Sequence, residues 1–246
     1  MKKDELSICG LAAVRARFER DAGSVQRLFF DDATGRKIGP LCKALAAARK
    51  VYRCVPPAEL EKIAGTLHHG GIVAVVTVPK LRAPSAAEVA GWAAQRAPLL
   101  VLDRIGNAHN LGAIARTAAF FGVPRLVLSA DPTAALPGEA AHRVAEGGLE
   151  AVELYRVPDI AAFCRGLAPH YLVAGAAVHG RAVTPAELRS RAGRQPIALV
   201  LGNEEHGLAP AVASACGQLV HIPGGDRVES LNVSVAAAVL IYALLV

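Results

Sequence analysis

Short apolar runs alternate with longer mixed segments along almost the whole chain, and the alternation falls into two blocks. In the first block, the spacing of apolar positions predicts helices at 10–20, 38–50 and 56–67 and strands at 24–30, 51–55 and 70–78. Residues 79–97 then mix prolines with small and charged side chains, which is typical of a linker that contains a short helix. We therefore expect a small α/β domain at 1–78, followed by a linker at 79–97.

The second block, residues 98–246, is dominated by continuously apolar runs separated by helical stretches. It predicts strands at 98–105, 124–130, 151–157, 171–178, 196–203 and 218–224. Strands that are apolar on both faces and alternate with helices favour a mostly parallel α/β sheet covered on both sides. Ligands of such sheets bind at the carboxyl ends of the strands, so the loops that follow the strands are the places to search for function.

Charge and composition narrow the class of partner. The chain has 246 residues, a formal net charge of +6 and an isoelectric point near 9.3. This balance suits nucleic acid, although a basic surface without a partner is equally compatible with it. The five cysteines show no C-x-x-C spacing, which favours a reducing cytoplasm over a disulfide framework or a zinc site. The apolar run at 233–246 is too short to span a bilayer, so no membrane partner is expected.

The first loop of interest follows the strand predicted at 98–105 and reads "GNAHNLGAIARTAAFFGVP". Asn110 is the expected N-cap of a helix that stops at Gly122. Arg116 points about 150° away from the apolar face of that helix and lies near Phe120 on the helical wheel. An arginine beside apolar residues suits a functional site or an interface, and an ordinary exposed arginine is the alternative.

The second loop, "LGNEEHGL", follows the strand predicted at 196–203. Gly202 and Gly207 flank polar residues, which permits close approach of the backbone to a ligand. Either Glu204 or Glu205 has a carboxylate suited to accepting hydrogen bonds from a ligand or to pairing with Arg116. A simple polar turn before a helix is the alternative.

The third loop, "HIPGGDRVESLN", leads into the C-terminal helix. Ser230 or Asn232 can cap that helix, and either can contact a ligand. The helix carries apolar side chains on every side, so it must be buried all round. One face can pack on its own sheet, and the other needs a second subunit.

These three loops, in this order, resemble the SpoU (TrmH) family of RNA ribose 2′-O-methyltransferases, within the SPOUT superfamily. The resemblance rests on N-x-G-x-x-x-R at Asn110, Gly112 and Arg116, on "LGNEEHGL" and on "IPGGDRVESLNVSVAAA". The N-terminal block also looks like the small RNA substrate-binding domain, similar to a ribosomal-protein fold, that precedes the catalytic domain in many members. One departure is Gly224, where members often carry methionine.

The resemblance implies a mostly parallel sheet whose C-terminal part forms a trefoil knot, a feature too rare to be predicted from the residue pattern alone. It implies S-adenosylmethionine as the cofactor, held by backbone groups near Gly202, Ile222 and Leu231. It also implies a homodimer built by the C-terminal helix, with the active site at the seam between subunits.

The activity implied is metal-free transfer of a methyl group to a ribose 2′-hydroxyl of structured RNA, with rRNA favoured over tRNA. By the resemblance, Arg116 helps to remove the hydroxyl proton. Arginine normally keeps its own proton, so a role in orienting the adjacent phosphate and stabilising the developing alkoxide is favoured on physical grounds. By the same resemblance, Asn110 holds the ribose or Arg116, Glu204 positions Arg116 or the cofactor, and Ser230 and Asn232 shape the site.

The N-terminal domain is expected to select the RNA. Its basic residues are Arg15, Arg17, Arg20, Arg36, Lys37, Lys43, Arg49, Lys50 and Arg53. Two other interpretations stay open: a non-catalytic RNA-binding protein that keeps the fold, and a nucleotide-dependent enzyme, which the lack of a G-x-G-x-x-G motif disfavours. His68 and His69 have no acidic or cysteine partner nearby in the sequence, so no metal site is expected.

Overall fold

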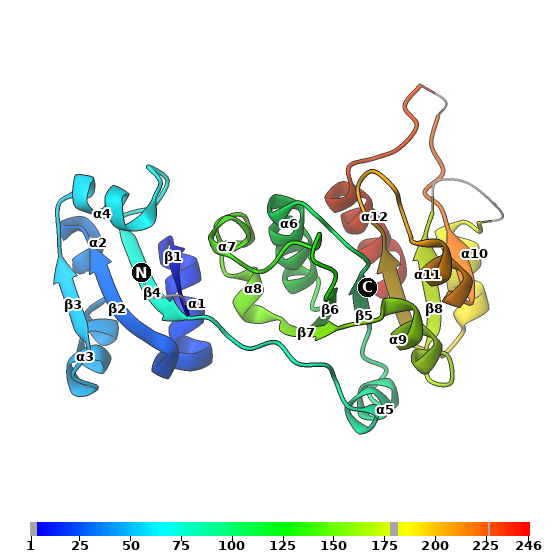
Figure 1. The fold of residues 1–246 in the computed structure, drawn as a ribbon, viewed down its shortest axis with the longest axis horizontal. Helices are drawn as coiled ribbons and strands as arrows, with labels where there is room; N and C mark the ends of the chain where they lie inside the picture. Colours follow the sequence, from blue (N-terminus) through cyan, green and yellow to red (C-terminus); the bar gives the residue numbers. More distant parts are fainter. Residues whose placement is uncertain (1–3, 178–181, 226) are drawn as a thin grey trace.

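The computed structural model describes residues 4–177, 182–225 and 227–246, and it contains two sheets joined by an extended segment (Figure 1). The strands of the first sheet are β1 (Glu5–Cys9), β2 (Val25–Phe30), β3 (Val51–Cys54) and β4 (Ile72–Thr77), in the order β1-β4-β2-β3. Only the β2–β3 pair is parallel, and the other pairs are antiparallel. The last residue of the strand predicted at 171–178 lies outside the described residues.

Helices cover both faces of the first sheet. Their bounds are α1 (Leu11–Asp21), the single turn η1 (Ala22–Ser24), α2 (Asp32–Gly35), α3 (Gly39–Ala47) and α4 (Pro57–Ala64). Apolar side chains of α1 and α3 share one core with the sheet, whereas Leu60 and Ala64 of α4 belong to a smaller core with Val73 of β4. These elements match the pattern predicted for residues 8–78, apart from β1, η1 and α2, which the sequence pattern does not single out.

The second sheet is parallel throughout, which confirms the mostly parallel sheet predicted for this half of the chain. Within the described residues its six strands run in the order β10-β8-β9-β5-β6-β7. Their bounds are β5 (Leu99–Leu102), β6 (Arg125–Ser129), β7 (Glu153–Val157), β8 (Leu172–Ala176), β9 (Ile197–Leu201) and β10 (Gln218–Val220).

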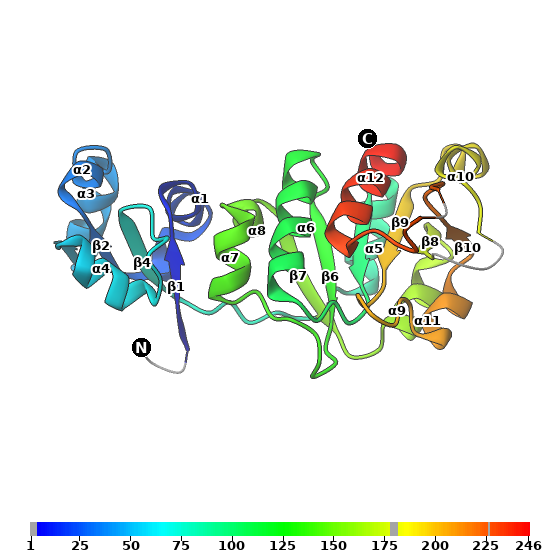
Figure 2. The ribbon, with the colours of Figure 1, turned by 90° about the horizontal axis from the view of Figure 1, so that it is seen from above.

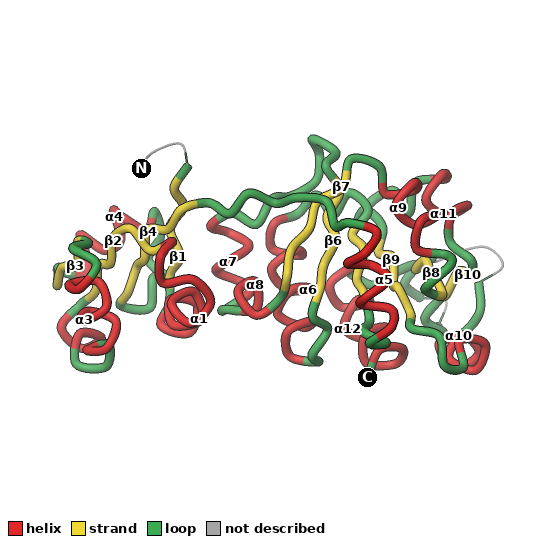
Figure 3. Tube along the Cα trace, turned by 90° about the horizontal axis from the view of Figure 1, so that it is seen from below, coloured by secondary structure: helices red, strands yellow, loops and turns green. Residues whose placement is uncertain are grey.

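Alternate residues of these strands supply two separate cores. In β5, Leu100 and Leu102 face one core, and Leu99 and Val101 face the other. The first face is covered by α6 (Ala108–Phe120), α7 (Glu139–Ala145), α8 (Gly148–Ala151), α10 (Pro185–Ala192) and α12 (Val233–Leu245). The second is covered by α5 (Ala86–Ala94), α9 (Ile160–Leu167) and α11 (Pro210–Ala215). Figures 2 and 3 show the two helix layers on opposite sides of the strands.

The helix inside the predicted linker packs against the second sheet. Val89 and Trp92 of α5 are buried in its second core, and the Trp92 ring lies 5.0 Å from the Tyr155 ring, centre to centre. A Ser85–Glu88 capping box fixes the start of α5. The extended part of the connection is therefore the stretch before this helix.

The short helices α7 and α8 lie between the first sheet and the rest of the second block in all three ribbon and tube views. One Nη of Arg20, in α1, donates to the carbonyl oxygens of Leu149, Glu150 and Val152 at 2.7–3.1 Å. The Ser7 N–H donates to Glu139 at 3.0 Å. These contacts fix α1 and β1 of the first sheet against α7 and α8.

In the three described ranges, no helix combines the length and the apolar character that crossing a bilayer requires.

Candidate active site

Side chains from three separate segments meet beyond the carboxyl ends of β5 and β9, and Glu204 lies at the centre. One carboxylate oxygen of Glu204 accepts the Gly106 N–H at 2.9 Å, and the other accepts the Asn107 N–H at 3.0 Å and the Asn110 side-chain amide at 2.8 Å. Partial burial alone would raise the pKa of the Glu204 carboxyl, but these hydrogen bonds outweigh it and lower the pKa. Glu204 is therefore a fixed anion at neutral pH.

Asn110 extends this network to the third loop. Its side-chain oxygen accepts a hydrogen bond from the Asn232 side-chain amide at 3.2 Å, so Glu204, Asn110 and Asn232 form one connected chain. Asn110 is buried, with 9% of its surface exposed. The structure thus brings together three of the five predicted catalytic residues.

The prediction that Asn110 caps its helix is wrong. The N-cap of α6 is Asn107, whose side-chain oxygen accepts the His109 N–H at 2.8 Å. Asn110 lies one turn further along, where its side chain faces Glu204 instead of the helix end. Two asparagines three residues apart offer the same local signal, and only the position of Glu204 distinguishes them.

Asn232 has a second role, as the cap of α12. Its side-chain oxygen accepts the N–H of Ser234 at 2.8 Å, while its amide donates to Asn110. Of the two cap candidates, Asn232 is thus the one that caps the helix. Ser230 is exposed in the preceding loop, on the approach to Asn232.

The loop that carries Glu204 is closed by its own backbone. Asn203 and Gly207 exchange two backbone hydrogen bonds, at 2.9 and 3.0 Å. A β-carbon on Gly202 would overlap the backbone of Gly207 and Leu208, so this position requires glycine. Asp103, buried at the end of β5, accepts the Ala209 N–H at 2.8 Å and fixes the far side of the loop.

The three predicted cofactor residues lie on the two loops beside the Glu204 network. Gly202 follows β9, Ile222 packs partly against the core, and Leu231 is half-exposed immediately before Asn232. A β-carbon on Gly224 would meet no atom within 4 Å. The space around this position therefore accommodates a larger side chain, and glycine there is not a steric requirement.

Arg116 does not join the network within one chain. Its Nη1 lies 3.0 Å from a carboxylate oxygen of Glu146, and both side chains are more than half exposed, at 55% and 60%. The suggested pairing of Glu204 with Arg116 is not seen, because Glu204 is occupied by the start of α6 and by Asn110. Arg116 instead lies on the side of α6 that faces α8.

The glycine in N-x-G-x-x-x-R has a packing role. A β-carbon on Gly112 would overlap the carbonyl oxygen of Ala141, and one on Gly148 would lie 2.6 Å from the α-carbon of Arg116. Both α7 and α8 thus approach α6 more closely than any side chain would permit. Gly112 of the motif thus allows α7 to pack closely against α6, the helix that carries Arg116.

The C-terminal helix buries only one face. Ala237, Leu240, Ile241 and Leu244 are buried against the sheet side, as predicted. The opposite face leaves Val235, Val239 and Tyr242 exposed at 48%, 39% and 65%. Phe120, at the end of α6, is 81% exposed, and the neighbouring Phe121 contacts the Tyr242 ring. Nothing in the described ranges covers this combined apolar surface of α12 and the end of α6.

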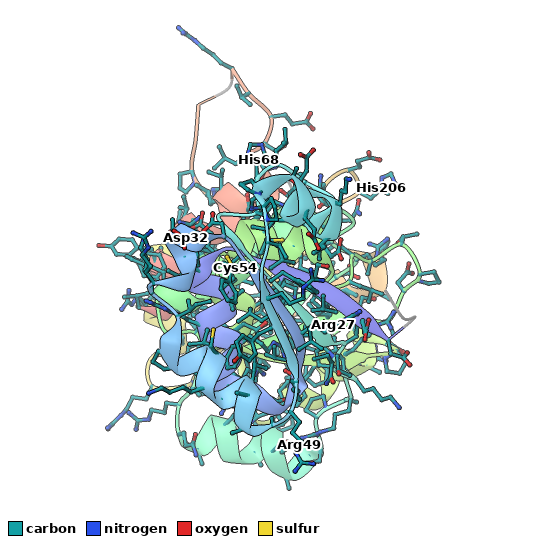
Figure 4. All side chains as sticks on the ribbon, turned by 90° about the vertical axis from the view of Figure 1, so that its left-hand side faces the viewer. Arg27, Asp32, Arg49, Cys54, His68 and His206 are labelled. Carbon is teal, nitrogen blue, oxygen red and sulfur yellow. The ribbon has the colours of Figure 1, made fainter. Side chains whose placement is uncertain are left out.

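Several of the basic residues expected to select RNA have other partners. Arg17 is buried and pairs with Glu150 at 2.8 Å, and Arg20 binds backbone carbonyls of the α8 segment. Figure 4 looks onto the first sheet from its outer end, where Arg49 and His68 mark opposite ends of the face. His69 is buried and accepts the Gly71 N–H at 3.1 Å, which stabilises a turn. In the part of the chain that the structure describes, no three metal-binding side chains cluster.

Comparison with models of known protein families shows which family this chain belongs to. The model described as the SpoU rRNA Methylase family matches residues 97–242, which is more than half of the chain. The chain belongs to the SpoU rRNA methylase family. A second model, described as RNA 2′-O ribose methyltransferase substrate binding, matches residues 7–81 of this family member.

Relatives match along nearly the whole chain. The 23S rRNA (guanosine-2′-O-)-methyltransferase RlmB of Acinetobacter baylyi is 33% identical over 238 residues, which cover 95% of this chain and 94% of the relative. The protein of the same name from Ralstonia nicotianae is 35% identical over 246 residues, with 98% and 95% covered.

Solved structures agree with the fold. The crystal structure of an AdoMet-bound rRNA methyltransferase from Sinorhizobium meliloti has a TM-score of 0.78 and covers 98% of this chain and 86% of its own. Its sequence is 21% identical, so the likeness concerns the fold alone. It supports the mixed α/β architecture with a mostly parallel sheet.

Sequence reasoning missed four residues that shape this site. Asn107, Asp103 and Asn203 fix the loops, and Glu146 pairs with Arg116. The first three carry a recognisable signal, since short polar side chains at strand ends commonly bond to nearby backbone. For Glu146 the only local signal is the pair of glycines that follows it in "AEGGLE".

Proposed function

We propose that this chain transfers a methyl group from S-adenosylmethionine to a ribose 2′-hydroxyl of structured RNA, with rRNA as the favoured substrate. The observation that carries the proposal is the Glu204–Asn110–Asn232 network, which joins the three family motifs at one edge of the sheet. Relatives at 33–35% identity over nearly the full chain are named 23S rRNA guanosine-2′-O-methyltransferases, which supports the same reaction.

The residues beside the network suit S-adenosylmethionine. Ile222 and Leu231 provide apolar surface for an adenine ring, and the closed loop after Gly202 offers backbone groups for polar contacts. The Glu204 carboxylate is the nearby fixed anion, which suits a cofactor with a positively charged sulfonium. When bound, the cofactor would supply an activated methyl group: the C–O bond to the 2′-oxygen would form as the C–S bond breaks, a neutral thioether would leave, and the hydroxyl proton would pass to solvent. We propose Gly202, Ile222 and Leu231 as the cofactor-binding residues.

The protein's part in this reaction is positioning. We assign Arg116 to orient the phosphate next to the target ribose and to stabilise the developing alkoxide. Asn110 and Asn232 are the amides that hold the ribose side of the site, and Glu204 fixes both through Asn110. Ser230, exposed on the loop, shapes the approach to the reacting atoms.

Within one chain Arg116 does not reach the Glu204–Asn110–Asn232 network, so it needs a second subunit to meet one. It precedes Phe120 by one helical turn, so it borders the apolar surface formed by α12 and the end of α6. A homodimer that buries this surface would place the site at the seam between subunits. The exposed Val235, Val239 and Tyr242 support this assembly.

The remaining expectations concern organisation. We propose an RNA-binding domain at 1–78, a linker at 79–97 and a catalytic domain at 98–246; the family models at 7–81 and 97–242 support this division. We also propose the trefoil knot, because the chain leaves the edge strand β10 and returns across the strand ends to Asn110 before forming α12. A cytoplasmic site of action stays a prediction.

The test uses purified protein, labelled S-adenosylmethionine and total RNA from cells that lack this gene. The proposal expects calorimetric cofactor binding and label in one RNA, and it expects Asn110→Ala to lower the transfer rate at least tenfold. Cofactor binding and RNA binding without any label would instead favour a non-catalytic RNA-binding protein.

A further inference from the structure

Arg116 is held by a corner of the chain outside the three family motifs. The corner is Glu146–Gly148, between α7 and α8. Its two contacts with Arg116 differ in kind: the Glu146 carboxylate pairs with the guanidinium at 3.0 Å, and Gly148 lies against the backbone, where a β-carbon would come within 2.6 Å of the Arg116 α-carbon.

The backbone of the corner adopts an uncommon conformation. Glu146 has φ 45°, in the left-handed region that non-glycine residues rarely occupy, and Gly147 follows with φ 95°. Such a conformation persists when the surrounding structure fixes it, and it is commonly found at functional sites. The Glu146 N–H bonds to the His142 carbonyl oxygen at 3.2 Å and completes the end of α7.

The other side of the corner contacts the N-terminal unit, which consists of the first sheet and its helices α1 to α4. A β-carbon on Gly147 would lie 3.4 Å from the Ala16 side chain of α1. Arg17 of the same helix pairs with Glu150, and Arg20 donates three hydrogen bonds to carbonyls at the end of α8. Helix α1 therefore lies on one side of the corner, and α6, which carries Arg116, lies on the other (Figure 2).

We infer that this corner positions Arg116 for methyl transfer, with Glu146 as the positioning residue, and that the N-terminal unit holds the corner through α1. This inference rests on the proposed function, because it assigns how the residue that contacts the RNA is held. Glu146 occupies one end of the guanidinium at 3.0 Å, and no other described residue pairs with Arg116, so its remaining N–H donors can bind a phosphate. Fixing the side chain in advance lowers the loss of freedom when RNA binds.

A positioning role has a kinetic signature that a general loss of structure lacks. Removing Glu146 frees the guanidinium, which lowers kcat, and it removes a negative charge beside the RNA, which lowers KM for RNA. We expect Glu146→Gly to reduce kcat about tenfold and KM about twofold. Glu146→Gln keeps an oxygen acceptor and should retain about half of the wild-type kcat. Glycine suits the positive φ of position 146, so Glu146→Gly should fold normally.

The experiment measures kcat and KM on in-vitro-transcribed 23S rRNA, together with cofactor binding by calorimetry. Glu153→Gln is the matched control, because Glu153, at the start of β7, is another half-exposed carboxylate and pairs with a different arginine, Arg125, at 3.4 Å. It should match wild type. Unchanged kcat in both Glu146 variants, with an active wild type, would overturn the inference alone. A wild type that transfers no methyl group would overturn the proposed function itself.

Arg20→Met tests the contribution of α1. If Arg20 acts through the corner, kcat falls about threefold and KM for RNA hardly changes. A rise in KM with unchanged kcat would show that Arg20 contacts RNA directly, and it would overturn the claim that α1 supports the corner.

Discussion

Substitution of Arg17 by methionine tests whether the N-terminal unit is firmly attached to the rest of the chain. Arg17 and Glu150 form an ion pair at 2.8 Å, and their side chains are 6% and 1% exposed. Methionine removes the charge but keeps a long apolar stem. The variant leaves the Glu150 carboxylate buried beside His142. Burial is the main cause that lowers the pKa of His142, and the substitution leaves this burial in place, so the neutral imidazole supplies no positive charge at pH 7.5.

The size of the effect follows from this burial. Breaking a buried ion pair by removing one partner costs about 3–5 kcal/mol, since an unpaired charge stays behind. For a chain of this length, 1 kcal/mol shifts Tm by about 2–4 °C, so the variant should melt about 6–20 °C below wild type. Adding Glu150→Met should restore most of the loss, because no buried charge remains.

Circular dichroism melts at pH 7.5 provide the measurement, with Arg36→Met as the control. Arg36 also pairs with an acid, Asp32, but both side chains are nearly 80% exposed. Exposed pairs contribute about 0–1 kcal/mol, so the control should shift Tm by no more than a few degrees. If Arg17→Met melts no lower than Arg36→Met, the two units are not joined as described.

Three further predictions concern other parts of the structure. Burial in the folded state lowers the pKa of His142 from 6.5 to about 4, so the neutral imidazole contributes fully to the free energy of unfolding above pH 6.5, and this contribution is lost as the pH falls toward 4. Urea titrations should show wild type losing about 2 kcal/mol of unfolding free energy between pH 7.5 and pH 5, relative to His142→Gln. Gly148→Ala should push α8 from Arg116 and destabilise the protein by about 1–3 kcal/mol, whereas Gly166→Ala, whose β-carbon meets no atom within 4 Å, should be neutral or slightly stabilising in the same titration. Tyr242→Asp should yield a monomer in sedimentation velocity if the exposed face of α12 forms the dimer, and a dimer that persists would place the interface elsewhere.

The second sheet was predictable because its central strands, such as β5 and β9, are apolar on both faces. The pattern also located the loops that converge on Glu204. It failed for β1, where Ser7 interrupts the apolar run. This serine is 2% exposed and contacts two helices distant in sequence: its hydroxyl donates to the Ile63 carbonyl oxygen of α4, and its N–H donates to Glu139 of α7. Local patterning contains no information about such distant cover.

The candidate site was predictable as a set of loops but not as a set of contacts. Asn110 is one of two asparagines that match the capping signal, and only Glu204, far along the chain, identifies its actual partner. Likewise, helical spacing places Arg17 on the buried face of α1 and Arg15 on the exposed face, but nothing local identifies Glu150 as the partner of Arg17. Both pairings depend on which helices meet in the folded chain.

The most direct measurement is the transfer of labelled methyl groups to RNA, followed by nuclease digestion to identify the modified atom, for wild type and Arg116→Ala. The account predicts label on a ribose 2′-oxygen with wild type, a loss of most of the rate with Arg116→Ala, and cofactor binding that survives in the variant. Label on a base instead of a ribose, or near wild-type turnover by Arg116→Ala, would contradict it.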